Sequence, residues 1–298
     1  MGILVIVVTY NAIKWVDHCL TSLYTSSFKP DVYVIDNGSI DGTQSFVQKQ
    51  FPQVRFLQNE VNLGFGKANN IGLQYAIDNN YEYVYLLNQD AWVMEDTLEK
   101  LISISKRYPK YGILSPLQMN DIEKQMDSSF LNSVCISNSI KNILADMFSG
   151  QMKDVYDVPY IMAAHWFISR DCIKIVGGFS PSFPHYGEDN NYANRVIYRG
   201  YKIGIVPSLR VVHDRANRQV SKTKSMYLSY IYCVAKLSNT SRSIKNSLLS
   251  CVVLQVSNAC KYKSLRPLGF LYKIIRDYRS IVKMRRISME QNGAFLNV

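Results

Sequence analysis

Three runs of apolar residues that do not alternate with polar ones constrain the fold of this 298-residue chain most strongly. The runs cover residues 3–8 (ILVIVV), 32–35 (VYVI) and 83–87 (YVYLL). A strand that is buried on both faces has this pattern, because neither face needs polar side chains. Each run leads into a polar loop. We therefore expect three core strands of one sheet, with loops that gather at its edge.

Segments with helical periodicity separate these predicted strands. The alternation of strand and helix favours an α/β fold with an open, mostly parallel central sheet flanked by helices. Ligands of such sheets bind beyond the carboxyl ends of the strands. The apolar positions at helical spacing are Ile13, Val16, Cys19, Leu20 and Leu23 after the first run, and Ala68, Ile71, Leu73, Tyr75 and Ala76 before the third.

The basic residues are concentrated in the C-terminal quarter. Residues 1–214 carry 18 basic and 21 acidic side chains, whereas residues 215–286 carry 16 basic side chains and one acidic one, a net charge of +15. We therefore expect a globular domain over residues 1–214 and a basic, helical extension over residues 215–298. Basic amphipathic helices are typical of surfaces that meet anionic lipid headgroups. A helical appendage with solvated charges is the alternative, and no recognition motif for nucleic acid accompanies the charge.

The six cysteines form no CxxC pair, and the histidines are not clustered. This argues against a zinc site or a disulfide framework and fits a reducing cytosol. The first predicted strand begins at residue 3 without a basic leader or a cleavage site, and polar residues interrupt the longest apolar stretch, near residues 248–256. We therefore expect neither a signal peptide nor a membrane-spanning helix.

The loop after the second run begins with Asp36, which precedes Asn37-Gly38-Ser39. A carboxylate at this position can accept hydrogen bonds from a nucleobase or a ribose, and glycine lets a ligand approach the backbone. A capped turn, in which aspartate and serine accept from backbone N–H groups, is the alternative.

Asp90 ends the tripeptide Asn88-Gln89-Asp90, directly after the third run. One carboxylate can hold Mg²⁺ or Mn²⁺ against a diphosphate, because these cations take few protein oxygens and complete their coordination with phosphate oxygens. His213 ends a further strand-like stretch, residues 202–212, and could supply an imidazole to the same metal. A helix cap at Asp90 and a structural histidine are the alternatives.

Glu188 and Asp189 precede a segment with helical character, residues 192–199, so both carboxylates are expected at a helix N-terminus. A favourable interaction with the helix dipole explains such a placement. A general base that deprotonates an attacking hydroxyl explains it equally well. Of two neighbouring carboxylates on one turn, at most one is expected to point at the chemistry.

Taken in order, these motifs resemble the family 2 glycosyltransferases, especially their bacterial rhamnosyltransferase-like branch. The similarity covers about residues 3–214 and rests on the order and spacing of six segments. They are residues 8–11 (VTYN), 35–43 (IDNGSIDGT), 62–72 (NLGFGKANNIG), 87–90 (LNQD), 177–179 (GGF) and 187–201 (GEDNNYANRVIYRGY).

The resemblance implies a GT-A type fold and a metal-dependent, inverting transfer of a sugar from a nucleotide-diphospho-sugar to an acceptor hydroxyl. By position, Asp189 would be the catalytic base, and Asp90 and His213 would bind Mg²⁺ or Mn²⁺. Residues 62–72 favour enzymes that transfer deoxyhexoses, such as L-rhamnose from dTDP-rhamnose. The resemblance implies acceptor-side positions at Trp166, Gly178 and Glu188, and donor-side positions at Thr9, Tyr10, Asn11, Asp36, Asn62, Gly64, Asn70, Asn88, Gln89 and Asp90.

The chain departs from the family pattern at two of these motifs. The metal motif often begins with an acidic residue, where this chain has Asn88, and asparagines 190 and 191 follow Asp189 where an acidic residue is common. A nucleotide-sugar-binding protein without turnover is therefore the alternative function. A dehydrogenase is disfavoured, because the first run leads into Thr9-Tyr10-Asn11 and not into a glycine-rich dinucleotide turn.

Enzymes of this class commonly build surface polysaccharides on lipid-linked carriers. Together with the basic extension, the resemblance favours a lipid-linked glycan acceptor. The expected location is the cytoplasm, with peripheral attachment at the inner face of the cytoplasmic membrane.

Overall fold

The computed structural model describes residues 2–120, 125–135, 139–183, 185–215 and 221–297. Within these residues, nine strands form one sheet in the order β3-β2-β1-β4-β8-β6-β9-β5, and β7 pairs with β9. The strands are β1 (Ile3–Thr9), β2 (Asp31–Asp36), β3 (Arg55–Gln58), β4 (Tyr83–Asn88), β5 (Ala91–Trp92), β6 (Tyr111–Met119), β7 (Tyr156–Asp157), β8 (His165–Ser169) and β9 (Lys202–His213).

The three predicted core strands are β1, β2 and β4. β1 pairs in parallel with both of the others, and Thr9 lies opposite Asp36. Beyond β4 the sheet is mixed, because β8 runs antiparallel to both β4 and β6. β9 is parallel to β6, and its last residue, His213, lies opposite Ala91 of β5. The pairing therefore brings His213 next to the loop that follows β4.

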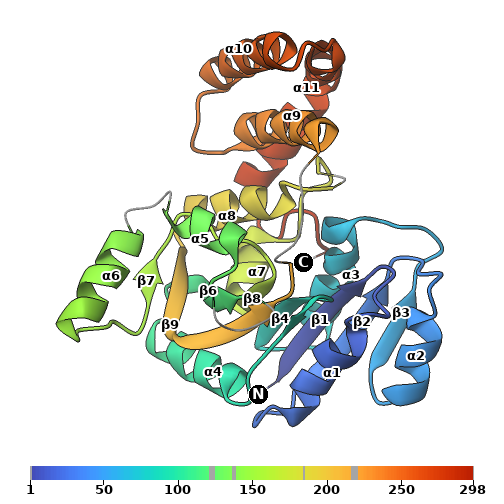
Figure 1. Cartoon of the computed structure of the whole chain (residues 1–298), viewed down its shortest axis with the longest axis vertical. Helices are drawn as coiled ribbons and strands as arrows, with labels where there is room; N and C mark the ends of the chain where they lie inside the picture. Colours follow the sequence, from blue (N-terminus) through green and yellow to red (C-terminus); the bar gives the residue numbers. More distant parts are fainter. Residues whose placement is uncertain (1, 121–124, 136–138, 184, 216–220, 298) are drawn as a thin grey trace.

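Helices cover both faces of the sheet (Figure 1). Successive side chains of a strand point to opposite faces, so Val5 packs against one helical layer and Ile6 against the other. The absence of a polar face on β1 explains its uninterrupted apolar run. One layer holds α1 (Val16–Thr25), α2 (Thr43–Gln50) and α4 (Thr97–Arg107), and the other holds α3 (Phe65–Asp78), α5 (Ser128–Cys135), α6 (Ser139–Ser149), α7 (Arg170–Val176) and α8 (Glu188–Tyr198).

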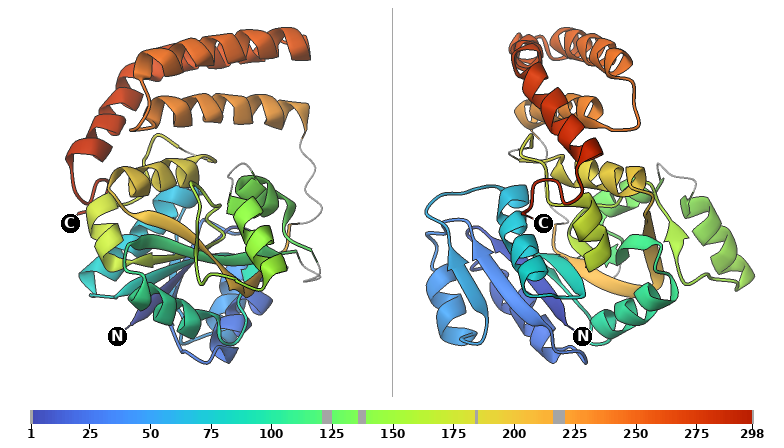
Figure 2. Two further views of the ribbon diagram at one scale, coloured as in Figure 1. Left: turned by 90° about the vertical axis from the view of Figure 1, so that its left-hand side faces the viewer. Right: turned by 180° about the vertical axis from the view of Figure 1, so that it is seen from behind.

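The basic extension is helical, as predicted, and consists of α9 (Lys222–Ser238), α10 (Ile244–Tyr262) and α11 (Arg266–Glu290). α9 lies over α8, and α10 lies on the far side of α9 from the sheet, whereas α11 begins there and runs back past α9 to the sheet domain (Figures 1 and 2). The three helices share an apolar core that includes Val234, Leu237 and Ile274. Arg285 of α11 donates to the carbonyls of residues 237, 240 and 242, and so satisfies carbonyl groups at the end of α9. No helix in the described part of the chain has a segment as long and apolar as a membrane span requires.

The segment after α11 returns to the sheet domain, where the C-terminus lies beside α3 (Figure 1). The backbone N–H of Gly178 donates to the carbonyl of Ala294 at 2.8 Å. The backbone N–H of Asn297 donates to Gln74 of α3 at 2.7 Å, and the Gln74 amide donates back at 3.1 Å. The extension is therefore held to the sheet domain through its last residues as well as through α9.

Candidate active site

Asp36 is completely buried at the end of β2 and accepts four hydrogen bonds. Its Oδ2 accepts from the hydroxyls of Thr9 and Ser39, both at 2.6 Å. Its Oδ1 accepts from the Ser39 backbone N–H at 2.7 Å and from the Gln58 amide at 2.8 Å. Four donors match the four lone pairs of a carboxylate. Asp36 and Thr9 therefore shape the predicted nucleoside site from within, by tying together the ends of β1, β2 and β3.

Tyr10, Asn11 and Gln89 lie at the same edge of the sheet, closer to the surface. The Tyr10 backbone N–H donates to the Gln89 side chain at 2.7 Å, and the Gln89 amide donates to the Tyr10 carbonyl at 3.2 Å. Asn11 has a φ of 50°, and its backbone N–H donates to the Ser39 hydroxyl at 2.7 Å. These bonds bring the loops after β1, β2 and β4 together, as the sequence predicts.

The predicted residues of segment 62–72 build the start of α3 and its contacts. The Gly64 backbone N–H donates to the Asn62 side chain at 2.9 Å. Asn70 donates to the Phe179 carbonyl at 2.9 Å and accepts from the Phe179 N–H at 2.6 Å. Asn70 therefore holds the loop after α7 against α3.

Two of the predicted acceptor residues lie deeper than expected. Trp166 is fully buried in β8; its indole N–H donates to the Ile161 carbonyl at 3.2 Å, and its ring stacks on Phe179. Gly178 lies beneath the C-terminal segment, where a Cβ atom would come within 2.5 Å of the Asn70 side chain. Neither residue is among those that line the cavity formed by Glu188 and its neighbours.

Asp90 and His213 come together, although 122 residues separate them in the chain. Asp90 Oδ1 and His213 Nε2 are 3.4 Å apart, and both side chains are buried. Adjacent ligands of a Mg²⁺ or Mn²⁺ ion, each about 2.1 Å from the metal, lie about 3 Å apart. The spacing therefore fits two neighbouring positions around such an ion. The neutral Asn88 amide lies 3.5 Å from the same imidazole nitrogen.

The rest of the metal coordination would have to come from elsewhere. Within the described residues, no three His, Cys, Asp or Glu side chains converge. His213 Nδ1 is buried and makes no hydrogen bond to the part of the chain that the structure describes. A two-ligand site suits a cation that completes its coordination with phosphate oxygens and water. The residues thus fit a metal that is held jointly by protein and donor.

Glu188 and Asp189 begin α8, as predicted, but their environments differ. Asp189 accepts from the Tyr160 hydroxyl at 2.7 Å through Oδ2 and from the Asn190 backbone N–H at 2.7 Å through Oδ1. Glu188 is 6% exposed, and its Oε2 has no hydrogen-bond partner in the described residues. Burial raises the pKa of both carboxyl groups, and the charge of Asp189 raises the pKa of Glu188 further, to about 8. Hydrogen-bond donors stabilise the charged form of Asp189 but not that of Glu188, so Asp189 is the better placed of the two to act as an ionised base.

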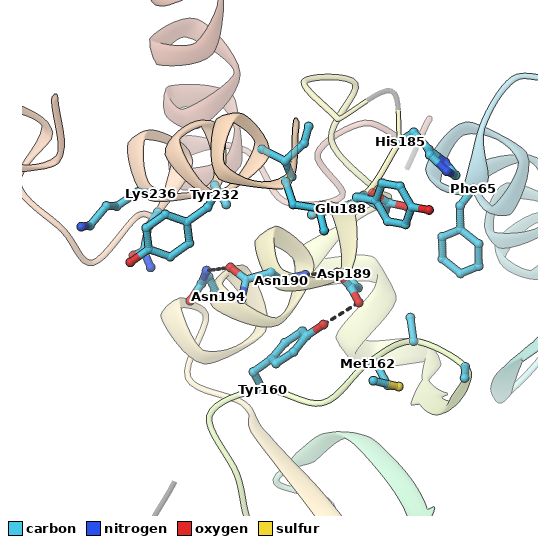
Figure 3. A pocket seen from close by; sticks show the side chains of 18 of the residues that line it. Phe65, Tyr160, Met162, His185, Glu188, Asp189, Asn190, Asn194, Tyr232 and Lys236 are labelled. Atoms are coloured by element: carbon cyan, nitrogen blue, oxygen red, sulfur yellow. Dashed lines mark hydrogen bonds between the residues drawn. The ribbon is translucent and has the colours of Figure 1, made fainter. Parts of the chain in front are cut away.

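A cavity of about 680 Å³ opens over these carboxylates. Asn88, His213 and Arg215 contribute from the strand ends, and Tyr160 and Met162 contribute from the segment before β8. Figure 3 shows Glu188 and Asp189 between Tyr160 on one side and the side chains of α9 on the other. The predicted base and one predicted metal ligand therefore line the same cavity.

α9 forms the wall opposite Tyr160, through side chains that are apolar near Glu188 and cationic farther along the helix. Gly187 permits this close approach: its φ is +84°, and a Cβ atom there would lie 2.6 Å from the Ile231 side chain. The α9 residues in the wall are Leu228, Ile231, Tyr232, Ala235 and Lys236, followed by Asn239 and Arg242.

Sequence reasoning missed Tyr160 and the α9 wall. Tyr160 lies in the short stretch between β7 and β8, and no motif or periodicity marks it. The α9 residues have helical spacing in the sequence, but the helix offers no local signal of which face meets the catalytic carboxylates. Only the tertiary structure identifies both.

The fold is the GT-A fold of glycosyltransferases that use nucleotide sugars. Staphylococcus aureus TarS in complex with UDP-GlcNAc superposes with a TM-score of 0.61 at 17% identity, covering 97% of this chain and 84% of that one. The mannosyltransferase PcManGT from Pyrobaculum calidifontis, in complex with GDP-Man and Mn²⁺, superposes with a TM-score of 0.57 at 19% identity, covering 95% and 84%. At these identities the likeness defines the fold alone.

Residues 4–173 match the family model described as glycosyl transferase family 2. The chain belongs to this family, as its motifs predict. It is 26% identical, over 233 residues, to the N-acetylglucosaminyl-diphospho-decaprenol L-rhamnosyltransferase of Mycobacterium tuberculosis. That match covers 72% of this chain and 76% of the relative.

Proposed function

We propose that this glycosyltransferase moves L-rhamnose from dTDP-L-rhamnose to a hydroxyl of a lipid-linked glycan, with inversion, during synthesis of a cell-surface polysaccharide. One observation carries the proposal: Asp189 and His213 line a single cavity at the strand ends. The name of the mycobacterial relative combines an L-rhamnosyl group with a sugar on diphospho-decaprenol, which favours this donor and this acceptor.

Asp189 acts as the general base. Its carboxylate takes the proton of the acceptor hydroxyl as the oxygen bonds to the anomeric carbon. The bond from that carbon to the donor phosphate breaks on the opposite side, and its electron pair leaves with the nucleoside diphosphate. A single displacement inverts the configuration without a sugar covalently attached to the protein. Tyr160, through its 2.7 Å hydrogen bond, orients the carboxylate for this step.

Asp90 and His213 would hold Mg²⁺ or Mn²⁺. When bound, the metal supplies positive charge that stabilises the departing diphosphate. Asn88 leaves the site with one acidic ligand, so we expect the metal to bind tightly only together with the donor. The Mn²⁺ in the GDP-Man complex of PcManGT is in keeping with this role.

We further infer that the enzyme works at the inner face of the cytoplasmic membrane. The net charge of +15 over residues 215–286 favours contact with anionic lipids. α9 belongs to this basic extension and also forms one wall of the cavity. An acceptor whose lipid stays in the membrane would therefore enter between α9 and the catalytic carboxylates.

The donor is tested by thermal shift with dTDP-, UDP- and GDP-sugars, each with and without Mn²⁺ or Mg²⁺. We expect dTDP-L-rhamnose to stabilise the protein only with metal, and Asp90→Ala to lose that stabilisation. Asp171→Ala, at an exposed carboxylate of α7, is the matched control and should behave as wild type. If a sugar of another nucleotide class stabilised the protein in a metal-dependent way, that sugar would be the donor and the assignment of dTDP-L-rhamnose would be wrong.

Turnover is tested with a short-chain lipid-diphosphate glycan as acceptor. Asp189→Asn should reduce transfer by about 10²- to 10⁴-fold, the usual contribution of a general base, and should keep metal-dependent donor binding. Donor binding without transfer in the wild type would instead support the alternative function, a nucleotide-sugar-binding protein without turnover.

A further inference from the structure

α10 buries polar side chains among its apolar contacts and exposes apolar ones. The side that packs against the other helices buries Ser247, Gln255 and Asn258 together with Cys251, and Leu248 and Leu254 pack partly against the shared core. Gln255 donates to the Ser229 hydroxyl and to the Cys233 sulfur of α9, both at 3.3 Å. The opposite side exposes apolar residues at a spacing of four and three: Leu249 is 67% exposed, Val253 is 61% exposed and Val256 is 46% exposed. A helix that only covered a soluble domain would have the opposite arrangement.

α11 also exposes apolar residues away from the shared core. Ile274 and Ile281 of α11 face the shared core. On the outer side, Leu265, Leu268, Tyr272 and Ile275 are exposed at a spacing of three, four and three. The two helices are joined by the turn at residues 263–265; α10 and the start of α11 lie beyond α9, and α11 then runs back toward the sheet domain (Figure 2). We define the outer hairpin face as the exposed apolar residues Leu249, Val253, Val256, Leu265, Leu268, Tyr272 and Ile275.

The helices that carry the outer hairpin face also expose many basic side chains. They are distributed over α10, the turn and α11, and Asp277 is the only acidic residue in the sequence between residues 215 and 286. Exposed apolar side chains accompanied by exposed lysine and arginine on the same helices match a membrane interface, where acyl chains lie beneath anionic headgroups. The exposed basic residues are Lys245, Lys261, Lys263, Arg266, Arg276, Arg279, Lys283 and Arg286.

We propose that the outer hairpin face is the surface by which this protein inserts into anionic lipid bilayers. The charge pattern selects this occupant over a second copy of the chain, because two such faces would bring like charges together. The inference deepens the proposed membrane location by assigning it to particular residues, and it adds apolar insertion to electrostatic attraction.

The position of α9 connects this face to the cavity. One side of α9 packs on α10 and α11, and its other side supplies Ile231 and Ala235 to the cavity wall. Two helical layers therefore separate the lipid-facing surface from the site: α10 with the start of α11, and then α9. Because packed helices lie about 8–10 Å apart, the diphosphate and first sugars of a lipid-linked acceptor would have to extend past both layers to bring the acceptor hydroxyl to Asp189.

Vesicle co-sedimentation of the full-length protein tests the proposal, with phosphatidylcholine vesicles that contain or lack phosphatidylglycerol. We expect wild type to bind the anionic vesicles. The triple variant Leu249→Ser, Val253→Ser and Tyr272→Ser should lower the partition coefficient at least about tenfold, as loss of three inserted apolar side chains implies. Phe148→Ser, at a strongly exposed residue of α6, is the matched control and should leave binding unchanged.

A charge series separates electrostatic attraction from insertion. Replacing Lys261, Arg279 and Lys283 by glutamine should weaken binding by about fivefold per residue at low salt. The same replacement at Lys49, Lys106 and Lys110 changes the net charge equally on another surface and should have little effect. If both sets of variants lost vesicle binding to the same extent, binding would depend only on the net charge of the protein, and the assignment to this face would be wrong.

Two further outcomes would overturn the proposal. One is equal vesicle binding by wild type and the apolar triple variant. The other is a dimer, detected by light scattering, that the triple variant converts to a monomer, because the face would then be an interface between copies. Transfer to a water-soluble acceptor should be unchanged in every variant. Failure of the lipid inference is thereby distinguishable from failure of the proposed transferase activity.

Discussion

The Tyr160 hydroxyl donates a 2.7 Å hydrogen bond to Oδ2 of Asp189 at the floor of the cavity. Burial and the neighbouring Asp189 charge raise the pKa of Tyr160, so the phenol remains a donor at physiological pH. Burial also raises the pKa of Asp189, whereas the bond from Tyr160 lowers it. The tyrosine therefore favours the ionised form that a general base requires.

Tyr160→Phe should shift the acid limb of the pH–rate profile to higher pH. The variant lacks a donor that stabilises the Asp189 carboxylate, so the pKa of Asp189 rises further and a larger fraction is protonated at neutral pH. The loss of kcat/KM should be greatest at low pH and should diminish as the pH rises. Steady-state kinetics across the pH range would measure the shift.

Tyr156→Phe is the control for this prediction. Tyr156 donates to Asp146 at 2.7 Å, the same type of bond, and neither residue lines the cavity. Its pH–rate profile should match wild type. A uniform loss of activity in Tyr160→Phe, with no shift along the pH axis, would instead assign Tyr160 a purely structural role.

His213→Ala should weaken donor-dependent metal binding as strongly as Asp90→Ala does. The two side chains are 3.4 Å apart, and neither alone offers the pair of adjacent ligands. Titration of Mn²⁺ in the presence of the nucleoside diphosphate, followed by calorimetry, would measure this loss. His18→Ala, at an exposed histidine of α1, should retain wild-type affinity. Full metal affinity in His213→Ala would remove this residue from the metal site.

Thermal stability should decrease as the pH rises from about 4.5 to about 8, in part because of Glu188. Its pKa in the folded protein is about 8, above the ordinary value of 4.5, so the folded state binds this proton more tightly than the unfolded state does. Stability therefore falls as the pH rises through this window. Glu188→Gln should show a smaller decrease in Tm, whereas the exposed Glu60→Gln should follow wild type. Identical Tm profiles for Glu188→Gln and wild type would contradict the assigned burial.

Asp36→Ala should lower the free energy of unfolding by about 3 kcal/mol or more, because four donors lose their acceptor. Denaturant unfolding would measure the change. Asp31→Ala, at the exposed start of the same strand, should cost much less. A small effect of Asp36→Ala would mean that water can replace the carboxylate, and would contradict its assigned role in holding the strand ends together.

Three of the parallel strands, β1, β2 and β4, could be predicted from sequence within about one residue at each end, whereas the short parallel strand β3 was not predicted. β1, β2 and β4 are buried on both faces, so each appears as a run without polar interruption. β6 contains Pro116 and Gln118, and β8 lies antiparallel between its neighbours. Their positions depend on pairing between distant parts of the chain, which no local pattern reports.

The ends of the strands predicted the site in part. Asp90, Asp189 and His213 were found because each follows an apolar run or begins a helical one. The capped-turn alternative at Asp36 is found, because its Oδ1 accepts from the Ser39 backbone N–H; the bonds from Thr9 and Gln58 were not predictable, because they come from the ends of neighbouring strands. The burial of Trp166 and the approach of α9 to Gly187 also depend on tertiary packing.

Because the chain returns from α11 to α3, the extension is attached to the catalytic domain at both of its ends. Ala294 accepts from Gly178 at one anchor, and Ile231 packs on Gly187 at the other. These two contacts oppose rotation of α10 and α11 relative to the catalytic domain. The fold itself therefore fixes the angle between these helices and the cavity. A protein that adsorbs through this hairpin would present its active site in a single orientation, and shortening the chain at residue 215 would open the cavity as well as remove the hairpin.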